Sequence, residues 1–228
     1  MERYVIIVAG GRGLRMGGDV PKQFIPIGGK PVLMHTVDVF RKTCPGIKVI
    51  LVLPREHHGL WHDLCSRYSF EPPFATVAGG ETRFHSVGNG LEAIPPGEHG
   101  TVGVHDGVRP FVSEETIREC YSMAESSGSA IPVVPVVETL RYIDPDGSRT
   151  VPRDRYRLVQ TPQVFGIDLL RRAYSQPFNP SFTDDASVVE AMGHGLTLVE
   201  GNRENVKLTT PSDLLYAEFL TRRLSREE

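Results

Sequence analysis

The sequence predicts an α/β fold in which a Rossmann-like, mostly parallel sheet is flanked by helices. Short apolar runs rich in Val and Ile alternate with longer helical stretches along most of the 228 residues. These runs are apolar at almost every position, as in parallel strands that are covered on both faces. Strands alternating with helices require crossover connections, which place helices on both sides of one sheet. A chain of this length is expected to form a single domain over residues 1–228.

The first part of the chain supplies four strands and four helices. The expected strands are Tyr4–Ala9, Ile47–Leu53, Thr101–His105 and Ala130–Val137. The expected helices are Pro31–Lys42, His57–Arg67, Phe84–Ala93 and Glu114–Ser126. In the first helix, Leu33, Val37 and Phe40 fall on one apolar face. The fourth helix follows Ser113, a residue type that commonly caps helix N-termini.

The alternation of strand and helix breaks after Val137. Glu138–Ile143 and Arg149–Arg153 read as two strands, and the intervening Asp144-Pro-Asp-Gly-Ser148 has the composition of a turn. The sequence therefore predicts a β-hairpin arm at about residues 137–156. Because two strands alone are marginally stable in water, we expect the arm to pack on another chain and to form a homodimer.

Two further helices are expected in the last part of the chain. Thr183-Asp-Asp opens one of them. Thr210 precedes the other as its N-cap, Pro211 takes the first helical position and Asp213 follows three residues after the cap.

Composition excludes several classes of function. The net charge of −3 argues against broad binding to nucleic acid or to an anionic membrane, which requires a basic surplus. No apolar run approaches the roughly 18 residues of a membrane-spanning helix, and a strand is expected almost at the N-terminus, where a signal peptide would lie. The three cysteines form no C-x-x-C pair and suit a reducing compartment. A cytoplasmic protein is expected.

A glycine-rich segment, residues 10–18, directly follows the first predicted strand. It holds five glycines in nine residues, and three cations accompany it, Arg12, Arg15 and Lys22. Bare backbone N–H groups and positive charge at the end of a buried strand are typical of a phosphate site. The segment matches neither the P-loop nor the dinucleotide-binding pattern: Gly29-Lys30 is followed by Pro31, and Met16 stands where the third glycine of the dinucleotide pattern belongs.

Six ordered motifs carry a resemblance to a known family. They are Gly10-Gly-Arg-Gly-Leu-Arg-Met16 with Pro21-Lys-Gln23, Gly79-Gly-Glu-Thr-Arg-Phe-His-Ser86, His105-Asp-Gly-Val-Arg-Pro110, Gln160-Thr-Pro-Gln163, Thr183-Asp-Asp-Ala-Ser187 and Asn205-Val-Lys-Leu-Thr-Thr-Pro211. In this order and spacing they resemble the 2-C-methyl-D-erythritol 4-phosphate cytidylyltransferases, a family of sugar nucleotidyltransferases. The resemblance runs from about residue 4 to residue 220. It implies transfer of a cytidylyl group from CTP to a sugar-alcohol phosphate, with release of pyrophosphate, in the non-mevalonate synthesis of isoprenoid precursors.

The resemblance also implies roles for individual residues in catalysis and in nucleotide binding. The catalytic cations that it implies are Arg15, Lys22, Arg153 and Lys207. The nucleotide-binding positions that it implies are Ala9, Gly10, Gly11, Gly13, Gly80, Glu81, Arg83, Ser86 and Asp106. Asp106 is also the implied ligand of Mg²⁺, which commonly takes one carboxylate together with phosphate oxygens and water. Without the resemblance, Asp106 reads equally as a turn-capping residue, and an ordinary helix cap is the alternative role for Ser86.

The acceptor phosphate requires its own binding groups. Those implied by the resemblance are Arg109, Thr139, Arg153, Thr161, Thr183 and Lys207. For Arg109, bracing of the Asp106 loop and contact with the nucleotide both stay open. Thr139 and Arg153 lie on the predicted arm, so an arm that crosses to a partner would complete the partner's site and couple dimerisation to catalysis.

Three alternatives are retained or set aside on sequence features. A ribitol-5-phosphate cytidylyltransferase has the same chemistry on another acceptor, although the segment Thr183–Ser187 favours the methylerythritol enzymes. A non-catalytic nucleotide-binding regulator on the same fold is disfavoured, because Arg15, Lys22 and Asp106 are all present. The pair His58 and His62 shares a helix face but has no evident third metal ligand.

Overall fold

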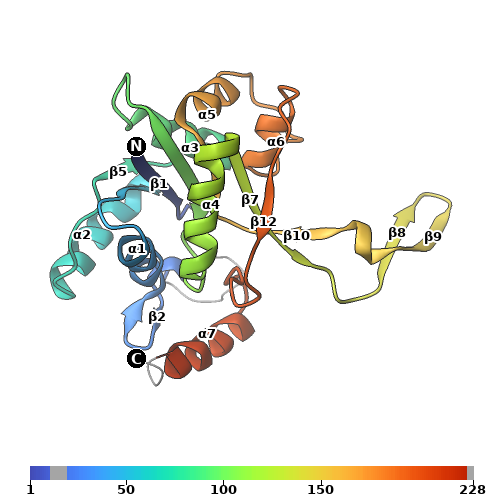
Figure 1. Ribbon diagram of the computed structural model, residues 1–228. Helices are drawn as coiled ribbons and strands as arrows, with labels where there is room; N and C mark the ends of the chain where they lie inside the picture. Colours follow the sequence, from blue (N-terminus) through green and yellow to red (C-terminus); the bar gives the residue numbers. More distant parts are fainter. Residues whose placement is uncertain (11–19, 225–228) are drawn as a thin grey trace.

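The computed structural model describes residues 1–10 and 20–224. In these ranges an eight-stranded sheet runs in the order β10-β7-β11-β6-β1-β4-β5, and β12 pairs with β7. The strands of this sheet are β1 Glu2–Val8, β4 Lys48–Leu53, β5 Ala75–Ala78, β6 Gly100–Asp106, β7 Ser129–Pro135, β10 Arg157–Val159, β11 Gln163–Gly166 and β12 Leu198–Glu200. The predicted α/β sheet is confirmed (Figure 1).

The centre of the sheet is parallel and its other side is mixed. Val5 in β1 pairs with Val49 in β4 and with Gly103 in β6, both in parallel register. β11 lies between β6 and β7 and is antiparallel to both. The sheet is therefore mostly parallel, as predicted, but the inserted strand β11 and the edge strand β10 run in the opposite direction.

Helices cover both faces of the sheet because successive side chains of each strand point to opposite sides. Val5 and Ile7 of β1 pack in a core with α1, α2 and α4, whereas Tyr4 and Ile6 pack in a second core with α3, α5 and α6. The helices are α1 Val32–Thr43, α2 His58–Arg67, α3 Arg83–Glu92, α4 Glu114–Ser127, α5 Ile167–Tyr174, α6 Asp185–Glu190 and α7 Pro211–Leu224. The ends of the four early helices differ from the predicted ones by only a residue or so.

Two of the predicted helix caps are present. The Ser113 hydroxyl accepts a hydrogen bond from the Thr116 N–H at 3.1 Å, at the start of α4. At the start of α7, the Thr210 N–H donates to Asp213 at 2.8 Å and the Asp213 N–H donates to the Thr210 hydroxyl at 3.3 Å. This reciprocal pair fixes the point at which the chain turns into the last helix.

The last helix closes a small third core below the main sheet. Ala217 and Leu220 of α7 pack with Ile27 and Leu208. Ile27 belongs to a short antiparallel pair, β2 Pro26–Ile27 and β3 Lys30–Pro31. No helix in the described part of the chain is both long and apolar enough to cross a membrane.

A hairpin of two strands, β8 Leu140–Asp144 and β9 Gly147–Val151, extends away from the sheet (Figure 1). Its pairing continues to Asp144 and Gly147, so the five-residue turn expected at 144–148 is wrong and only Pro145 and Asp146 form the turn. The reason is local: the Asp146 N–H donates to the Asp144 carboxylate at 3.1 Å, and Gly147 adopts a φ of 145°. The use of this hairpin in dimerisation stays a prediction.

The packing of α3 on β1 gives a test with a matched control. A Cβ on Gly90 would lie 2.7 Å from Cγ2 of the buried Ile6, whereas a Cβ on Gly88 would meet no atom within 4 Å. We expect Gly90→Ala to lower the free energy of unfolding by about 1–3 kcal/mol through overpacking. Gly88→Ala, in the same helix, should raise it by up to about 1 kcal/mol. Urea denaturation measures both, and equal effects of the two substitutions would contradict this packing.

Candidate functional site

The carboxyl ends of β1, β4 and β6 meet at one edge of the sheet, where ligands of such folds bind. Backbone hydrogen bonds continue past the strand ends and tie the loops together there. The Ala9 N–H donates to Val52 O at 2.9 Å, and the Gly107 N–H donates to Val8 O at 2.9 Å. The Gly79 N–H donates to Leu53 O at 2.8 Å. Three of the motifs singled out from the sequence therefore begin at one edge of the sheet.

Asp106 lies at the centre of this edge and is only 7% exposed. Its Oδ2 atom accepts a hydrogen bond from Arg109 Nε at 2.9 Å and lies 3.1 Å from Lys207 Nζ. Burial by itself would raise the pKa of Asp106, but the positive charges of Lys207, Arg83 and Arg109 hold the pKa well below its usual value. Asp106 is therefore a carboxylate at neutral pH.

Hydrogen bonds with His105 and Thr161 fix the backbone of the loop that carries Asp106 and Arg109. Burial lowers the pKa of His105 to about 4, so its ring is neutral at physiological pH. His105 Nε2 lies 3.0 Å from the Arg109 carbonyl oxygen, to which it donates. His105 Nδ1 then accepts from the Thr161 hydroxyl at 3.0 Å, and the Asp106 N–H donates to the same hydroxyl oxygen at 3.2 Å.

This arrangement bears on the role of Thr161. The residue is buried, and its hydroxyl proton is engaged by His105 rather than free for a ligand. In the structure Thr161 therefore supports the backbone of Asp106. A direct contact of Thr161 with the acceptor stays a prediction.

Lys207 reaches Asp106 because the segment around it is held by the fully buried Asn205. Asn205 Nδ2 donates to the Thr161 carbonyl oxygen at 2.8 Å, and its own carbonyl oxygen accepts from Arg109 Nη1 at 2.8 Å. One residue after Lys207, the Leu208 N–H donates to Val108 O at 2.9 Å. Arg109 thus braces the Asp106 loop against the Asn205 segment, one of the two roles left open for it.

The loop from Gly79 to Ser86 is shaped by its own side chains. Thr82 caps α3, accepting from the His85 N–H at 3.4 Å, so the helix-cap interpretation of Ser86 is wrong. The buried Ser86 hydroxyl instead donates to Thr82 O at 2.9 Å and accepts from the Gly80 N–H at 3.1 Å. Glu81 is exposed at the tip of the loop.

Arg83, the first residue of α3, points toward a second buried carboxylate. Its Nη2 atom donates to Asp185 Oδ2 at 2.6 Å, and its side chain is 29% exposed. The charge of Arg83 also lowers the pKa of Asp106, so this guanidinium acts on both carboxylates. Arg83, Asp106, Arg109 and Lys207 are the predicted site residues that the structure most clearly brings together.

The backbone just before the glycine-rich segment is held by Gln23, a residue with no predicted role. The fully buried Gln23 donates from Nε2 to the Ala9 carbonyl oxygen at 2.9 Å. Lys22 precedes it in the short 3-10 helix Lys22–Phe24, and Gly10 is exposed. Gly11, Gly13 and Arg15 lie outside the described residues.

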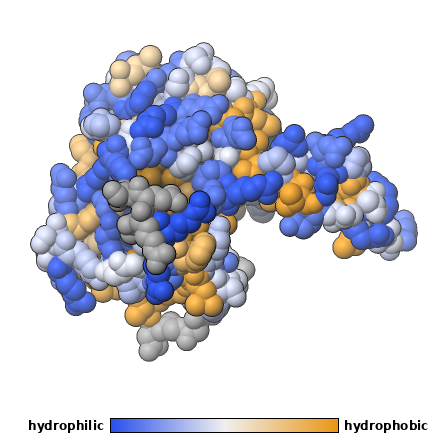
Figure 2. Space-filling view, turned by 60° about the horizontal axis from the view of Figure 1, so that its bottom comes forward, coloured by the Kyte–Doolittle hydropathy of each residue, from blue (hydrophilic) through white to orange (hydrophobic). Residues whose placement is uncertain are grey.

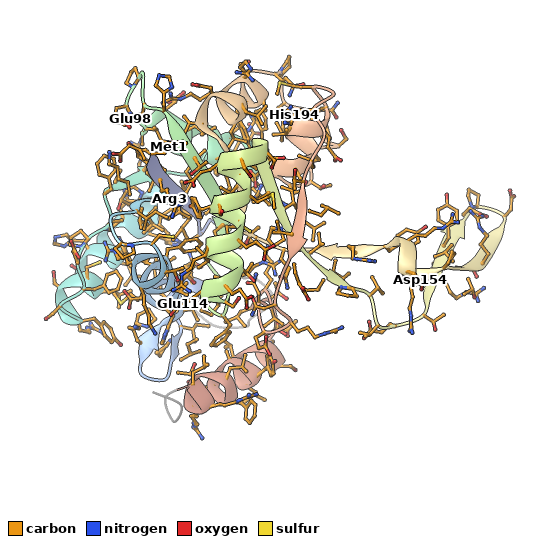
Figure 3. The ribbon with its side chains drawn as sticks, in the orientation of Figure 1. Met1, Arg3, Glu98, Glu114, Asp154 and His194 are labelled. Atoms are coloured by element: carbon orange, nitrogen blue, oxygen red, sulfur yellow. The ribbon has the colours of Figure 1, made fainter. Side chains whose placement is uncertain are left out.

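The structure does not bring the two arm residues to Asp106 of their own chain. Thr139 and Arg153 are exposed, and Arg153 Nη1 donates to the Val137 carbonyl oxygen at the base of the arm. Asp154, the neighbour of Arg153, lies out on the arm, away from the body of the molecule (Figure 3). Thr183 is exposed at the start of the α6 segment.

Several buried polar residues that support the site carry no predicted role. They are Gln23, Gln160, Gln163, Asp185 and Asn205. All five lie inside motifs quoted for the resemblance. In the sequence, each of these residues is visible only as an uncharged or acidic polar residue next to an apolar run. Their hydrogen-bond partners become apparent only in the folded structure.

Comparisons with known proteins agree with the motifs. The family model described as IspD, 2-C-methyl-D-erythritol 4-phosphate cytidylyltransferase, matches residues 4–223. The 2-C-methyl-D-erythritol 4-phosphate cytidylyltransferase of Bacteroides thetaiotaomicron is 60% identical over 94% of this chain and 97% of its own. That of Phocaeicola vulgatus is 60% identical over 96% of this chain and 100% of its own. The crystal structure of 4-diphosphocytidyl-2C-methyl-D-erythritol synthase from Anaerococcus prevotii superposes with a TM-score of 0.82 at 29% identity, covering 97% of this chain and 96% of that one.

The lowered pKa of Asp106 predicts a specific pH dependence of stability. A carboxylate with a depressed pKa in the folded state stabilises the fold above its unfolded pKa, about 3.9, and loses that contribution as the pH falls further. Relative to Asp106→Asn, the wild type should therefore lose on the order of 2 kcal/mol of unfolding free energy between pH 5 and pH 2. Denaturant melts across this range measure the difference. Asp63→Asn on the exposed face of α2 is the control, and parallel curves for wild type and Asp106→Asn would contradict the prediction.

Proposed function

The chain belongs to the 2-C-methyl-D-erythritol 4-phosphate cytidylyltransferase family, and from this premise we propose that it transfers a cytidylyl group from CTP to 2-C-methyl-D-erythritol 4-phosphate. The products are 4-diphosphocytidyl-2-C-methyl-D-erythritol and pyrophosphate, in the non-mevalonate synthesis of isoprenoid precursors. The observation that carries the proposal is the cluster of Asp106, Arg109 and Lys207 at the strand ends, in a chain related to the family along nearly its whole length.

The reaction needs positioned positive charge more than acid–base chemistry. A phosphate oxygen of the acceptor attacks the α-phosphorus of CTP, the bond from that phosphorus to the bridging oxygen of the β-phosphate breaks, and pyrophosphate leaves with the electron pair. We assign Lys22 and Arg15 to the α-phosphate, and Lys207 with Arg153 to the acceptor phosphate. Removing one such donor typically costs about 10²–10³ in turnover.

The nucleotide is assigned to the edge of the sheet between Ala9–Gly10 and α3. Its binding groups would be Ala9, Gly10, Gly11, Gly13, Gly80, Glu81, Arg83, Ser86 and Asp106. Gly80 supports this assignment, because a Cβ there would lie 2.9 Å from the His85 carbonyl carbon and 3.2 Å from the Ser86 nitrogen. The loop can therefore keep this close turn only with glycine at position 80.

Asp106 fits a single-carboxylate magnesium site. Arg109 and Lys207 both contact it at Oδ2. No cluster of three His, Cys, Asp or Glu side chains suited to a metal occurs in residues 1–10 or 20–224. Phosphate oxygens and water would supply the remaining ligands, as is usual for Mg²⁺. When bound, the ion neutralises charge on the triphosphate.

The arm is assigned to a homodimer in which Thr139 and Arg153 serve the partner's site, while Arg109, Thr161 and Thr183 belong to the acceptor side of their own chain. Apolar side chains on and near the arm are exposed, among them Val137 at 51%, Tyr142 at 48% and Ile143 at 78%. Figure 2 shows this apolar surface along the arm and where it joins the body. Such a patch on a thin hairpin is typical of an interface.

We place the protein in the cytoplasm. The three cysteines, Cys44, Cys65 and Cys120, are free and buried in the structure. Burial raises the pKa of the Cys120 thiol to about 12, so this cysteine stays a neutral, unreactive thiol. Reduced cysteines of this kind are typical of the cytoplasm.

Release of pyrophosphate tests the proposed reaction. The assay combines each of four nucleoside triphosphates with 2-C-methyl-D-erythritol 4-phosphate or with ribitol 5-phosphate, with and without Mg²⁺. Turnover is expected only with CTP, the methylerythritol acceptor and Mg²⁺. Preference for ribitol 5-phosphate would replace the acceptor, and binding of CTP without any turnover would favour a nucleotide-binding regulator.

Mixed dimers test whether Arg153 acts in the partner's site. Arg153→Ala and Lys207→Ala are each expected to be nearly inactive as homodimers. If the arm crosses, a heterodimer of the two variants has one intact site and one doubly altered site, so an equal mixture should recover about a quarter of wild-type activity. If Arg153 acts within its own chain, every site in the mixture carries one lesion. Activity no higher than that of the separate variants would then be observed.

A further inference from the structure

A second buried carboxylate, Asp185, lies behind the proposed nucleotide site and has no part in the mechanism above. It is the first residue of α6 and is fully buried. Each of its oxygens has a different partner: Oδ2 accepts from Arg83 Nη2 at 2.6 Å, and Oδ1 accepts from the Tyr174 hydroxyl at 2.5 Å. A buried carboxylate is costly unless it is paired in this way, so the arrangement calls for a specific use.

Tyr174 completes the pairing as a permanent donor. Burial, together with the nearby charge of Asp185, raises the pKa of Tyr174 well above its ordinary value, so the hydroxyl keeps its proton. The ring is fixed as well, because it stacks on Phe84 with ring centres 4.6 Å apart and planes inclined by 16°. Asp185 is therefore held in place by Tyr174 of α5 and in turn holds Arg83 of α3.

Arg83 is the residue that this pairing positions. Within the described part of the chain only one of its nitrogens donates a hydrogen bond, and that bond goes to Asp185. The remaining N–H groups of the guanidinium are available to a ligand, and the side chain is 29% exposed. The charge of Asp106 also attracts Arg83. The direct contact of Arg83 is to the tyrosine-braced Asp185.

The same contacts join the nucleotide loop to the segment that carries Thr183. Phe84, next to Arg83, stacks on Phe182, next to Thr183, with ring centres 5.6 Å apart. Asp184 caps α6 and accepts from Gln163 Nε2 at 2.7 Å. The two segments assigned to the two substrates are thus packed against each other through rings and through the Arg83–Asp185 pair.

We propose that Asp185 and Tyr174 are positioning residues that hold the Arg83 guanidinium toward the nucleotide and fix the nucleotide loop against the Thr183 segment. The inference rests on the proposed function, in which Arg83 contacts CTP. It predicts that removing the tyrosine hydroxyl or the charge of Asp185 weakens the use of CTP only while Arg83 is present. A role in folding alone would lower stability without this dependence on Arg83.

The test is a double-mutant cycle on the full-length protein, with kcat and KM for CTP from pyrophosphate release, the Kd for CTP from calorimetry, and thermal melts. Tyr174→Phe is expected to lower kcat/KM for CTP about 3–10-fold and Asp185→Asn about 10–100-fold. In the Arg83→Gln background neither change should lower it further. Tyr121→Phe is the matched control: it also removes a buried tyrosine hydroxyl, one that donates to Tyr4 O at 2.6 Å, and should leave kcat/KM unchanged.

Two results would overturn the inference. One is an unchanged kcat/KM and Kd for CTP in Tyr174→Phe, and the other is an equal loss with and without Arg83. If Asp185→Asn does not fold, the Tyr174→Phe cycle decides alone. The Kd for CTP reports on positioning without any acceptor, so a wild type that binds CTP but turns over no acceptor contradicts the proposed function and leaves this test intact.

Discussion

The structure of the site depends on one buried charge, the carboxylate of Asp106 at the end of β6. A carboxylate that is almost completely buried stays ionised only if cations lie close to it. Arg109 comes from the loop that follows it, Lys207 from a segment about a hundred residues later, and Arg83 acts from the start of α3. The need to balance this charge therefore brings together three segments that are distant in the sequence.

Neutral polar groups convert that attraction into fixed geometry. His105, Thr161 and Asn205 use their side chains to hold backbone atoms of the Asp106, Arg109 and Thr161 loops. If the backbone were free to move, a cationic side chain could reach its carboxylate in many rotamers. With the backbone held by hydrogen bonds, only a few rotamers remain. Asp185 repeats the principle on the other side of the site, where it holds Arg83 with help from a tyrosine. Both buried carboxylates thus hold cationic side chains in fixed positions.

Much of this fold could be predicted from the sequence because its strands are short, apolar and regularly spaced. The caps Ser113 and Thr210 were identifiable because capping is a local interaction. Asp106 and Lys207 could be singled out only through a family resemblance. The hydrogen bond of Thr161 to His105 and that of Asn205 to Thr161 were not predictable, because their partners are about 40 residues or more away. The antiparallel insertion of β11 was missed for a different reason: the sequence of a short apolar strand does not encode its direction in the sheet.

The central claim is that Asp106 and Lys207 depend on each other within the folded site. It is tested most directly by the coupling free energy between them, from the unfolding free energies of Asp106→Asn, Lys207→Met, the double variant and the wild type at pH 7. The contacts predict a favourable coupling of about 1–3 kcal/mol that falls at high salt. Additive effects, with a coupling near zero at low salt, would contradict the claim.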